Sequence, residues 1–214
     1  MAETLADTGP GPGHRVTRRG QATREILLNT TIKLVALNGY GATSIQAVLD
    51  DTGYSRGALL HQFPTRESLM VATAQTAMEQ MLLAIEAGLL RYDSLLQGMR
   101  DFPTIMWRVQ NELPARAFTE IQLASRWDLG LTDGLTRAMH AMDARLGAQI
   151  TEFAQMHEIE DVTGLIDDLY LLITATQGLA IGRDLVADRT KTAAALTLLR
   201  DRFLGGIAQR MAPP

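Results

Sequence analysis

The segment 39–63 constrains the fold of this chain more than any other, because it encodes two short helices with one glycine between them. Apolar residues of the first helix recur at the spacing of a single helix face: Ile45, Val48 and Leu49. Residues that can cap or stop a helix stand between and before the two helices: Thr43 or Ser44, then Gly53, then Ser55. The segment is therefore predicted to form a helix-turn-helix.

The second of these helices, Arg56 to about Gln62, is too short to be stable alone. It must pack Leu59 and Phe63 against its neighbours, and this leaves its N-terminal residues pointing outward. In a DNA-binding protein, residues in that position enter the major groove.

The ordered motifs around this segment resemble the DNA-binding domain of the TetR family of transcriptional regulators. The resemblance covers about residues 23–70 and rests on Thr23–Leu28, Gly39-Tyr40, Thr43-Ser44, Gly53–Gly57, Phe63 and Thr65–Leu69. Two positions depart from the family pattern. Leu60 stands where the family usually has tyrosine, and Gln62 where histidine or tyrosine often precedes the final phenylalanine. A tyrosine that contacts phosphate is thus missing, and His61 or Gln62 can substitute.

The resemblance implies a homodimeric transcriptional regulator that binds double-stranded DNA. We predict that Arg56 and His61 contact bases or phosphates, and that Ser55 and the Gly57 backbone approach the duplex. The predicted phosphate contacts are Thr43, Ser44, Tyr54 and Arg66, with Gln62 as a further DNA-binding residue.

Composition and charge agree with this interpretation. Long apolar-periodic segments and the absence of β-type alternation predict an all-α fold. No cysteine is present, which excludes disulfides and thiolate sites. The start lacks the features of a signal peptide and no segment reaches about 20 apolar residues, so we expect a cytoplasmic protein. Residues 14–70 hold seven Lys/Arg against four acids, whereas residues 71–214 hold thirteen against eighteen. A basic front on an acidic body suits contact with phosphates at one end.

We predict three parts along the chain: a flexible basic arm over 1–22, a helix-turn-helix domain over 23–68, and a ligand-binding and dimerisation domain over 69–214. The arm is either a solvated tail or touches DNA. Predicted helices span 23–38, 66–90, 93–112 with a kink or break at Pro103, 114–129, 131–157, 163–186 and 190–211.

The segment 163–185 is apolar on nearly every face, so it must be covered on two sides. It is either a buried core helix or, with the last helix, half of a four-helix dimer interface. The residues predicted for that interface are Leu172, Ala175, Leu179, Leu196, Leu199 and Phe203.

Soft, aromatic and polar residues at helical spacing in the larger domain can form ordinary core or line a mostly apolar ligand cavity. The predicted ligand-binding residues are Phe102, Met106, Trp107, Gln110, Phe118, Gln122, Trp127, His140, Tyr170, Thr174 and Gln177.

Enzymatic alternatives lack support, because none of the common nucleophile, phosphate-loop, dinucleotide or zinc motifs occurs. His157, Glu158, Glu160 and Asp161 can be drawn as a metal cluster, but a solvated helix end explains them better. We therefore expect no catalytic residue, metal or cofactor. The predicted function is a repressor released from its operator by a small apolar or aromatic effector. The alternative is a helical small-molecule-binding protein without specific DNA readout, which the replacement at Leu60 would explain.

Overall fold

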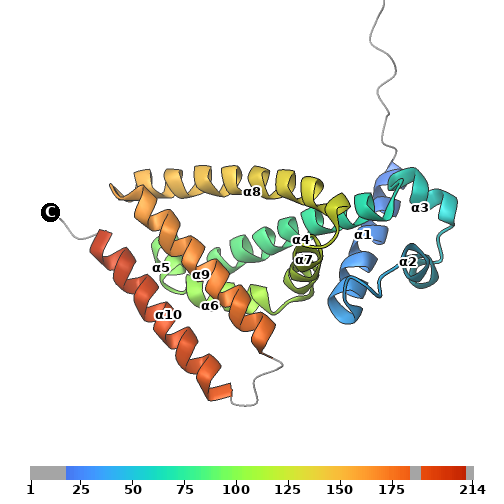
Figure 1. Ribbon diagram of the computed structural model, residues 1–214. Helices are drawn as coiled ribbons and strands as arrows, with labels where there is room; N and C mark the ends of the chain where they lie inside the picture. Colours follow the sequence, from blue (N-terminus) through green and yellow to red (C-terminus); the bar gives the residue numbers. More distant parts are fainter. Residues whose placement is uncertain (1–17, 184–188, 211–214) are drawn as a thin grey trace, which may run out of the picture.

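The computed structural model describes residues 18–183 and 189–210, which form ten α-helices and no strand (Figure 1). The predicted all-α fold is confirmed. The helices are α1 (Arg18–Asn38), α2 (Ile45–Thr52), α3 (Arg56–Gln62), α4 (Arg66–Leu89), α5 (Leu95–Arg100), α6 (Phe102–Gln110), α7 (Leu113–Ala124), α8 (Leu129–Met156), α9 (Val162–Gly182) and α10 (Arg189–Arg210).

Local capping explains the three-helix unit at one end of the molecule. The Ser44 hydroxyl accepts from the Ala47 N–H at 3.1 Å and starts α2, while the Ser55 hydroxyl accepts from the Ala58 N–H at 3.2 Å and starts α3. Gly53 ends α2 in the left-handed conformation, with φ at 71°. The apolar faces of α1 to α4 then close a small core: Leu27, Leu28, Val48, Leu49, Leu59, Phe63, Leu69 and Ala72.

Helix α1 begins at Arg18, five residues before the predicted start, so the predicted arm over 1–22 is too long. Tertiary contacts account for the extension. The Gln62 side chain donates to the Gly20 carbonyl at 3.3 Å, and the Arg24 guanidinium lies 4.5 Å from the Phe63 ring centroid. Residues 1–17, the rest of the predicted arm, lie outside the described residues.

The larger body is built from α4 to α10, with α8 along one edge and α9 and α10 side by side across the front (Figure 1). The predicted 93–112 helix is two helices, α5 and α6, which meet at Asp101. Pro103 occupies the first turn of α6, where its missing N–H costs no hydrogen bond. The ends of the predicted 163–186 and 190–211 helices fall partly outside the described residues.

The two parts share a core. Ile32 and Val35 of α1 pack in one cluster with residues of α4, α7 and α8, among them Met70, Ile121 and Leu131. Helix α7 packs extensively on both α1 and α4. A movement of α7 therefore displaces the helix-turn-helix unit, because a close-packed core transmits displacement.

Helix α9 corrects the expectation that no segment of the chain is long and apolar enough to span a membrane. By length and composition it is apolar enough to cross a membrane, and only 22% of its most apolar stretch is buried in the single chain. A core helix of a water-soluble protein passes the same test. What distinguishes α9 is an apolar face that its own chain leaves uncovered.

Arg210 joins the far ends of α9 and α10. Its guanidinium donates to Asp161 at 2.9 Å and to Asp168 at 2.5 Å, and the Arg210 contact helps lower the pKa of the Asp161 carboxyl, after the backbone N–H of Gly164. A Cβ at Gly206 would stand 2.3 Å from the Asp168 carboxylate, so glycine leaves room for this ion pair. The contact fixes how the two helices present their outer faces.

Candidate functional site

The outer face of α3 carries the residues expected to meet DNA. Arg56, Gly57 and His61 are exposed, as is the Ser55 cap. Arg56 makes no hydrogen bond or ion pair with any residue of the described chain. Arg18 and Arg19 are also exposed, at the end of α1 that Gln62 ties to α3. A free cation on a short exposed helix, with further cations beside it, is suited to a polyanion.

Arg66 is placed differently from the prediction. Its guanidinium lies 4.0 Å from the Tyr40 ring centroid, and it donates to the carbonyls of Tyr40 at 2.6 Å and Thr43 at 3.2 Å. Through these contacts, the Arg66 guanidinium stabilises the turn before α2. Its predicted role as a phosphate contact is therefore corrected to a structural one.

Three further predicted DNA contacts are partly or wholly engaged inside the domain. Thr43 is buried and its hydroxyl donates to the Gly39 carbonyl at 2.9 Å, so it is withdrawn as a phosphate contact. Tyr54 packs against the small core, and the Gln62 amide binds Gly20. Leu60 also packs against that core. Its apolar side chain is thus explained by packing, which removes the observation behind the alternative function.

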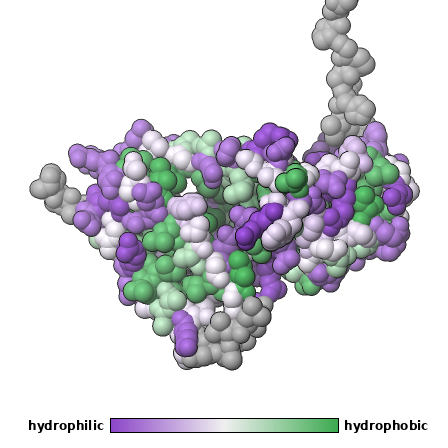
Figure 2. Space-filling view, viewed as in Figure 1, coloured by the Kyte–Doolittle hydropathy of each residue, from purple (hydrophilic) through white to green (hydrophobic). Residues whose placement is uncertain are grey.

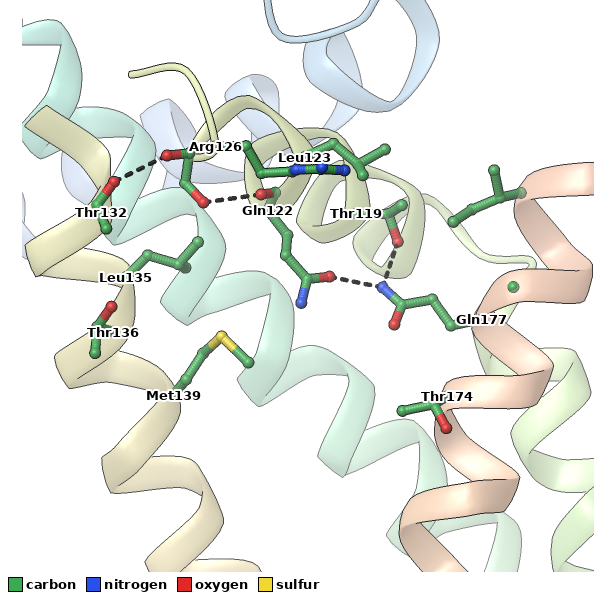
Figure 3. Close-up of a pocket in the computed structure, with 13 residues that line it drawn as sticks. Thr119, Gln122, Leu123, Arg126, Thr132, Leu135, Thr136, Met139, Thr174 and Gln177 are labelled. Atoms are coloured by element: carbon green, nitrogen blue, oxygen red, sulfur yellow. Dashed lines mark hydrogen bonds between the residues drawn. The ribbon is translucent and has the colours of Figure 1, made fainter. Parts of the chain in front are cut away.

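A cavity of about 500 Å³ opens between α7, α8 and α9 (Figure 3). Its lining mixes hydroxyl, amide and apolar side chains: Thr119, Gln122, Leu123, Ser125, Arg126, Thr132, Leu135, Thr136, Met139, Thr174, Gln177, Gly178 and Ile181. This size lies within the usual range of small-molecule sites, about 300–1,000 Å³. We call it the α7–α9 cavity.

Two glutamine side chains meet across the upper part of this cavity. The Gln177 amide nitrogen donates to Gln122 Oε1 at 2.9 Å and to Thr119 Oγ1 at 3.1 Å. Figure 3 shows both amides extending from α7 and α9 toward each other, with Met139 and Leu135 of α8 opposite them. The pair fixes two polar groups that the sequence places 55 residues apart.

A second cavity, of about 280 Å³, lies between α4, α5, α6, α8 and α9 and is lined mainly by apolar side chains. It is lined by Leu82, Ile85, Glu86, Leu89, Met99, Phe102, Leu146, Gln149, Ile150, Phe153, Leu169 and Ile173. It shares no residue with the α7–α9 cavity and has few groups that could orient a ligand.

One partly buried hydrogen bond links the helix-turn-helix unit to the junction of α7 and α8, next to the α7–α9 cavity. The Tyr40 hydroxyl, between α1 and α2, donates to Asp128 Oδ2 at 2.6 Å, at the junction of α7 and α8. Burial, then the hydrogen bond to Asp128, raises the pKa of Tyr40 to about 12. The stability from this bond is fully present below the ordinary tyrosine pKa of about 10 and is lost as pH rises through 12.

Comparison with known proteins agrees with this arrangement. The sequence profile of bacterial regulatory proteins of the tetR family matches residues 27–73, from α1 into α4. The transcriptional regulator CymR of Pseudomonas putida, of the helix-turn-helix type, is 25% identical over 177 residues, covering 77% of this chain and 83% of CymR. The chain belongs to the TetR family. It is a DNA-binding transcriptional regulator.

Solved structures show that this TetR-family chain has the fold of the family along nearly its whole length. A TetR-family regulator from Pectobacterium atrosepticum gives a TM-score of 0.67 at 19% identity, covering 92% of this chain and 99% of that one. The multidrug binding protein EbrR, complexed with imidazole, gives a TM-score of 0.58 at 17% identity, covering 93% and 97%.

The predicted ligand residues of this TetR-family protein do not converge on one site. Gln122, Thr174 and Gln177 line the α7–α9 cavity, whereas Phe102 lines the apolar one. The other predicted ligand residues line neither cavity, because they lie on other faces of their helices. Trp127 and Tyr170 are 84% and 70% exposed and His140 is exposed, while Met106 and Phe118 are buried core residues; Gln110 and Trp107 border two other hollows. Trp127, His140, Tyr170, Met106 and Phe118 are withdrawn as cavity-lining residues.

Sequence reasoning found Thr174 but missed the other hydroxyl groups of the α7–α9 cavity. Thr132 and Thr136 are one turn apart on α8, on the same side as Met139, and Thr119 is buried on α7. The four-residue spacing of the threonines was a usable signal. Asp128 could not be found in this way, since nothing local links it to Tyr40.

The uncovered face of α9 and α10 also differs in detail from the predicted dimer interface. Leu172 and Phe203 are buried in the body core and Leu199 packs against it, because α10 lies on α9 and α6 of its own chain. These three positions are corrected to core. The outward residues are Leu171 and Leu198, 41% and 69% exposed, and the small residues Gly178 and Gly182. Figure 2 shows apolar surface gathered over these two helices.

Proposed function

We propose that this TetR-family regulator is a homodimeric repressor that leaves its operator when a small molecule occupies the α7–α9 cavity. The observation that carries the proposal is the position of this cavity against α7, the helix that packs on both α1 and α4. Regulators of this family bind DNA operators and small-molecule effectors and act as dimers. EbrR, with the same fold, is described as multidrug binding.

The route from cavity to DNA runs through packed helices. A ligand that spreads α7 from α9 displaces α7 against α1 and α4, and thereby changes the separation of the two α3 helices in the dimer. DNA geometry sets the half-site separation at about 34–36 Å. A ligand that binds better to the displaced arrangement therefore weakens operator binding, in proportion to its differential affinity.

An effector should raise the melting temperature and lower operator affinity together. Blocking the cavity with Thr174→Trp should abolish the thermal shift while ligand-free DNA binding persists, because Thr174 lines the cavity far from α3. A broad compound screen by thermal shift, followed by fluorescence anisotropy on an operator selected from random duplexes, measures both effects. Thr163→Trp, on the same helix but outside the cavity lining, is the matched control. Binders that never alter DNA affinity would contradict the proposal.

Tyr40→Phe should weaken the response to the effector more than it weakens folding. The variant keeps the ring under Arg66 but removes the hydrogen bond to Asp128. One such bond contributes about 1–2 kcal/mol, so the ratio of operator affinities without and with effector should fall roughly five- to thirty-fold. The measurement is that ratio, obtained with a compound from the screen.

Tyr92→Phe is the control for this comparison. It also breaks a tyrosine–aspartate bond, to Asp101, but within the body and away from α1. Its affinity ratio should match the wild type. If Tyr92→Phe and Tyr40→Phe reduce the ratio equally, the Tyr40–Asp128 bond is not the connection.

We also propose a cytoplasmic location, as for soluble regulators of this family, and no catalytic activity. Within residues 18–183 and 189–210, no three His, Asp or Glu side chains come together as a metal site. The chemistry of the cavity is that of binding.

A further inference from the structure

We propose that the α7–α9 cavity recognises a neutral ligand bearing a cis-amide edge, that is, an N–H and a C=O side by side, as in a lactam. This inference rests on the proposed function only in taking that cavity as the effector site. It replaces the predicted apolar or aromatic effector by a specific chemical class, and it is carried by the geometry of the Gln122–Gln177 pair.

The two amides leave one carbonyl oxygen and one amino group unused. A glutamine side chain has two N–H donors and one carbonyl acceptor. Gln177 uses its nitrogen on Gln122 and Thr119, so its carbonyl oxygen is left; Gln122 uses its oxygen, so its nitrogen is left. Neither remaining group has a partner among the described residues. In Figure 3 the Gln122 nitrogen and the Gln177 oxygen both point into the cavity.

The pattern survives rotation of the amides. If both side chains turn over by 180°, Gln122 donates to Gln177 and the roles of the unused groups exchange. Because the bond between them requires one amide to donate and the other to accept, the pair always presents one N–H next to one C=O. The complementary ligand edge has an acceptor next to a donor in either case.

Other common ligand groups fit this edge poorly. An ionised carboxylate offers two acceptors, one of which would face the Gln177 oxygen, and an ammonium group offers no acceptor to Gln122. Arg126 alone among the described lining residues carries a charge, and it is exposed at the rim. The walls around the pair include Leu123, Leu135, Met139 and Ile181, which suit a hydrocarbon ring.

The test compares fused lactams with their N-methyl analogues, led by 1(2H)-isoquinolinone and its N-methyl derivative. Isothermal titration calorimetry on the full-length protein without DNA measures both. The lactam should bind about ten-fold more tightly, because methylation removes the donor and leaves the glutamine carbonyl unpaired.

Two substitutions should give different signatures. In the amide orientation of Figure 3, Gln177→Leu should remove the preference, bringing the ratio of lactam to N-methyl affinity near one; with both amides turned over, the two variants exchange their signatures. Gln122→Leu should weaken both compounds similarly, since both keep the carbonyl. Gln155→Leu, an exposed glutamine of α8 outside the lining, should change neither. Melting curves check that each variant is folded.

Equal affinities in the wild type, a preference retained in both Gln177→Leu and Gln122→Leu, or failure of every lactam in a graded ring-size series would overturn the inference. These outcomes are separate from the fate of the proposed function. If other compounds release the operator while lactams do not bind, the repressor proposal stands and the ligand class is wrong. If lactams bind with the expected signatures but leave DNA affinity unchanged, the ligand class stands and the switching proposal fails.

Discussion

Replacing Gly178 or Gly182 with arginine should convert the protein from dimer to monomer and abolish tight operator binding. A Cβ at either position meets no atom within 4 Å in the single chain, so the substitution leaves the chain's own packing intact. In a dimer whose α9 helices approach along Leu171, Ala175, Gly178 and Gly182, the same arginine blocks close contact and is buried without a partner.

The expected effect is large. An unpaired buried charge costs about 3–5 kcal/mol, which raises the dimer dissociation constant about 100-fold or more. Light scattering with size exclusion measures the mass, and melting curves confirm folding. Because Gly178 also lines the α7–α9 cavity, the Gly182 variant separates dimer loss from cavity effects. Gly147→Arg on α8, equally open in the single chain, should remain dimeric. Dimers in all three variants would place the interface elsewhere.

Arg56→Ala should weaken operator binding roughly ten- to 100-fold while leaving the melting temperature unchanged. Its side chain is exposed at the start of α3 and makes no ion pair or hydrogen bond within the described chain, so only the DNA complex loses a contact. If the contact is to a phosphate, the slope of log affinity against log salt should fall by about one; if to a base, discrimination at one position should relax.

Arg66→Ala provides the contrast. It removes two hydrogen bonds to backbone carbonyls and a cation–π contact, so unfolding should become easier by about 2 kcal/mol. Its salt slope should match the wild type. Should Arg66→Ala retain full stability but lose one unit of salt slope, the guanidinium reaches DNA after all. Unchanged affinity in Arg56→Ala would refute the docking of α3.

Several features could be predicted from the sequence because their causes are local. A serine hydroxyl caps the N–H groups of the next turn, so Ser44 and Ser55 mark where α2 and α3 begin. Gly53 adopts a backbone conformation that other residues avoid, and this sets the end of α2. The break near Pro103 has the same local origin.

The candidate site could be predicted only in part, because pairing in space decides which polar groups are free. Arg56 and Arg66 are both cations beside α3 in the sequence, yet one is exposed and the other is held by Tyr40 and Thr43. Similarly, apolar periodicity marks Phe203 as a residue that will be buried, but it does not say whether its own chain or a partner covers it.

The sequence by itself determined the helices, their caps and the all-α class, since these follow from interactions within about four residues. Only the tertiary structure decided that Gln177 meets Gln122 and that Tyr40 meets Asp128, 55 and 88 residues apart. Contacts at such separations depend on how whole helices cross and pack, which no short spacing in the chain encodes. The DNA-binding fold could therefore be predicted from the sequence, whereas the chemistry of the cavity depends on side chains of α7 and α9 that meet only in the folded chain.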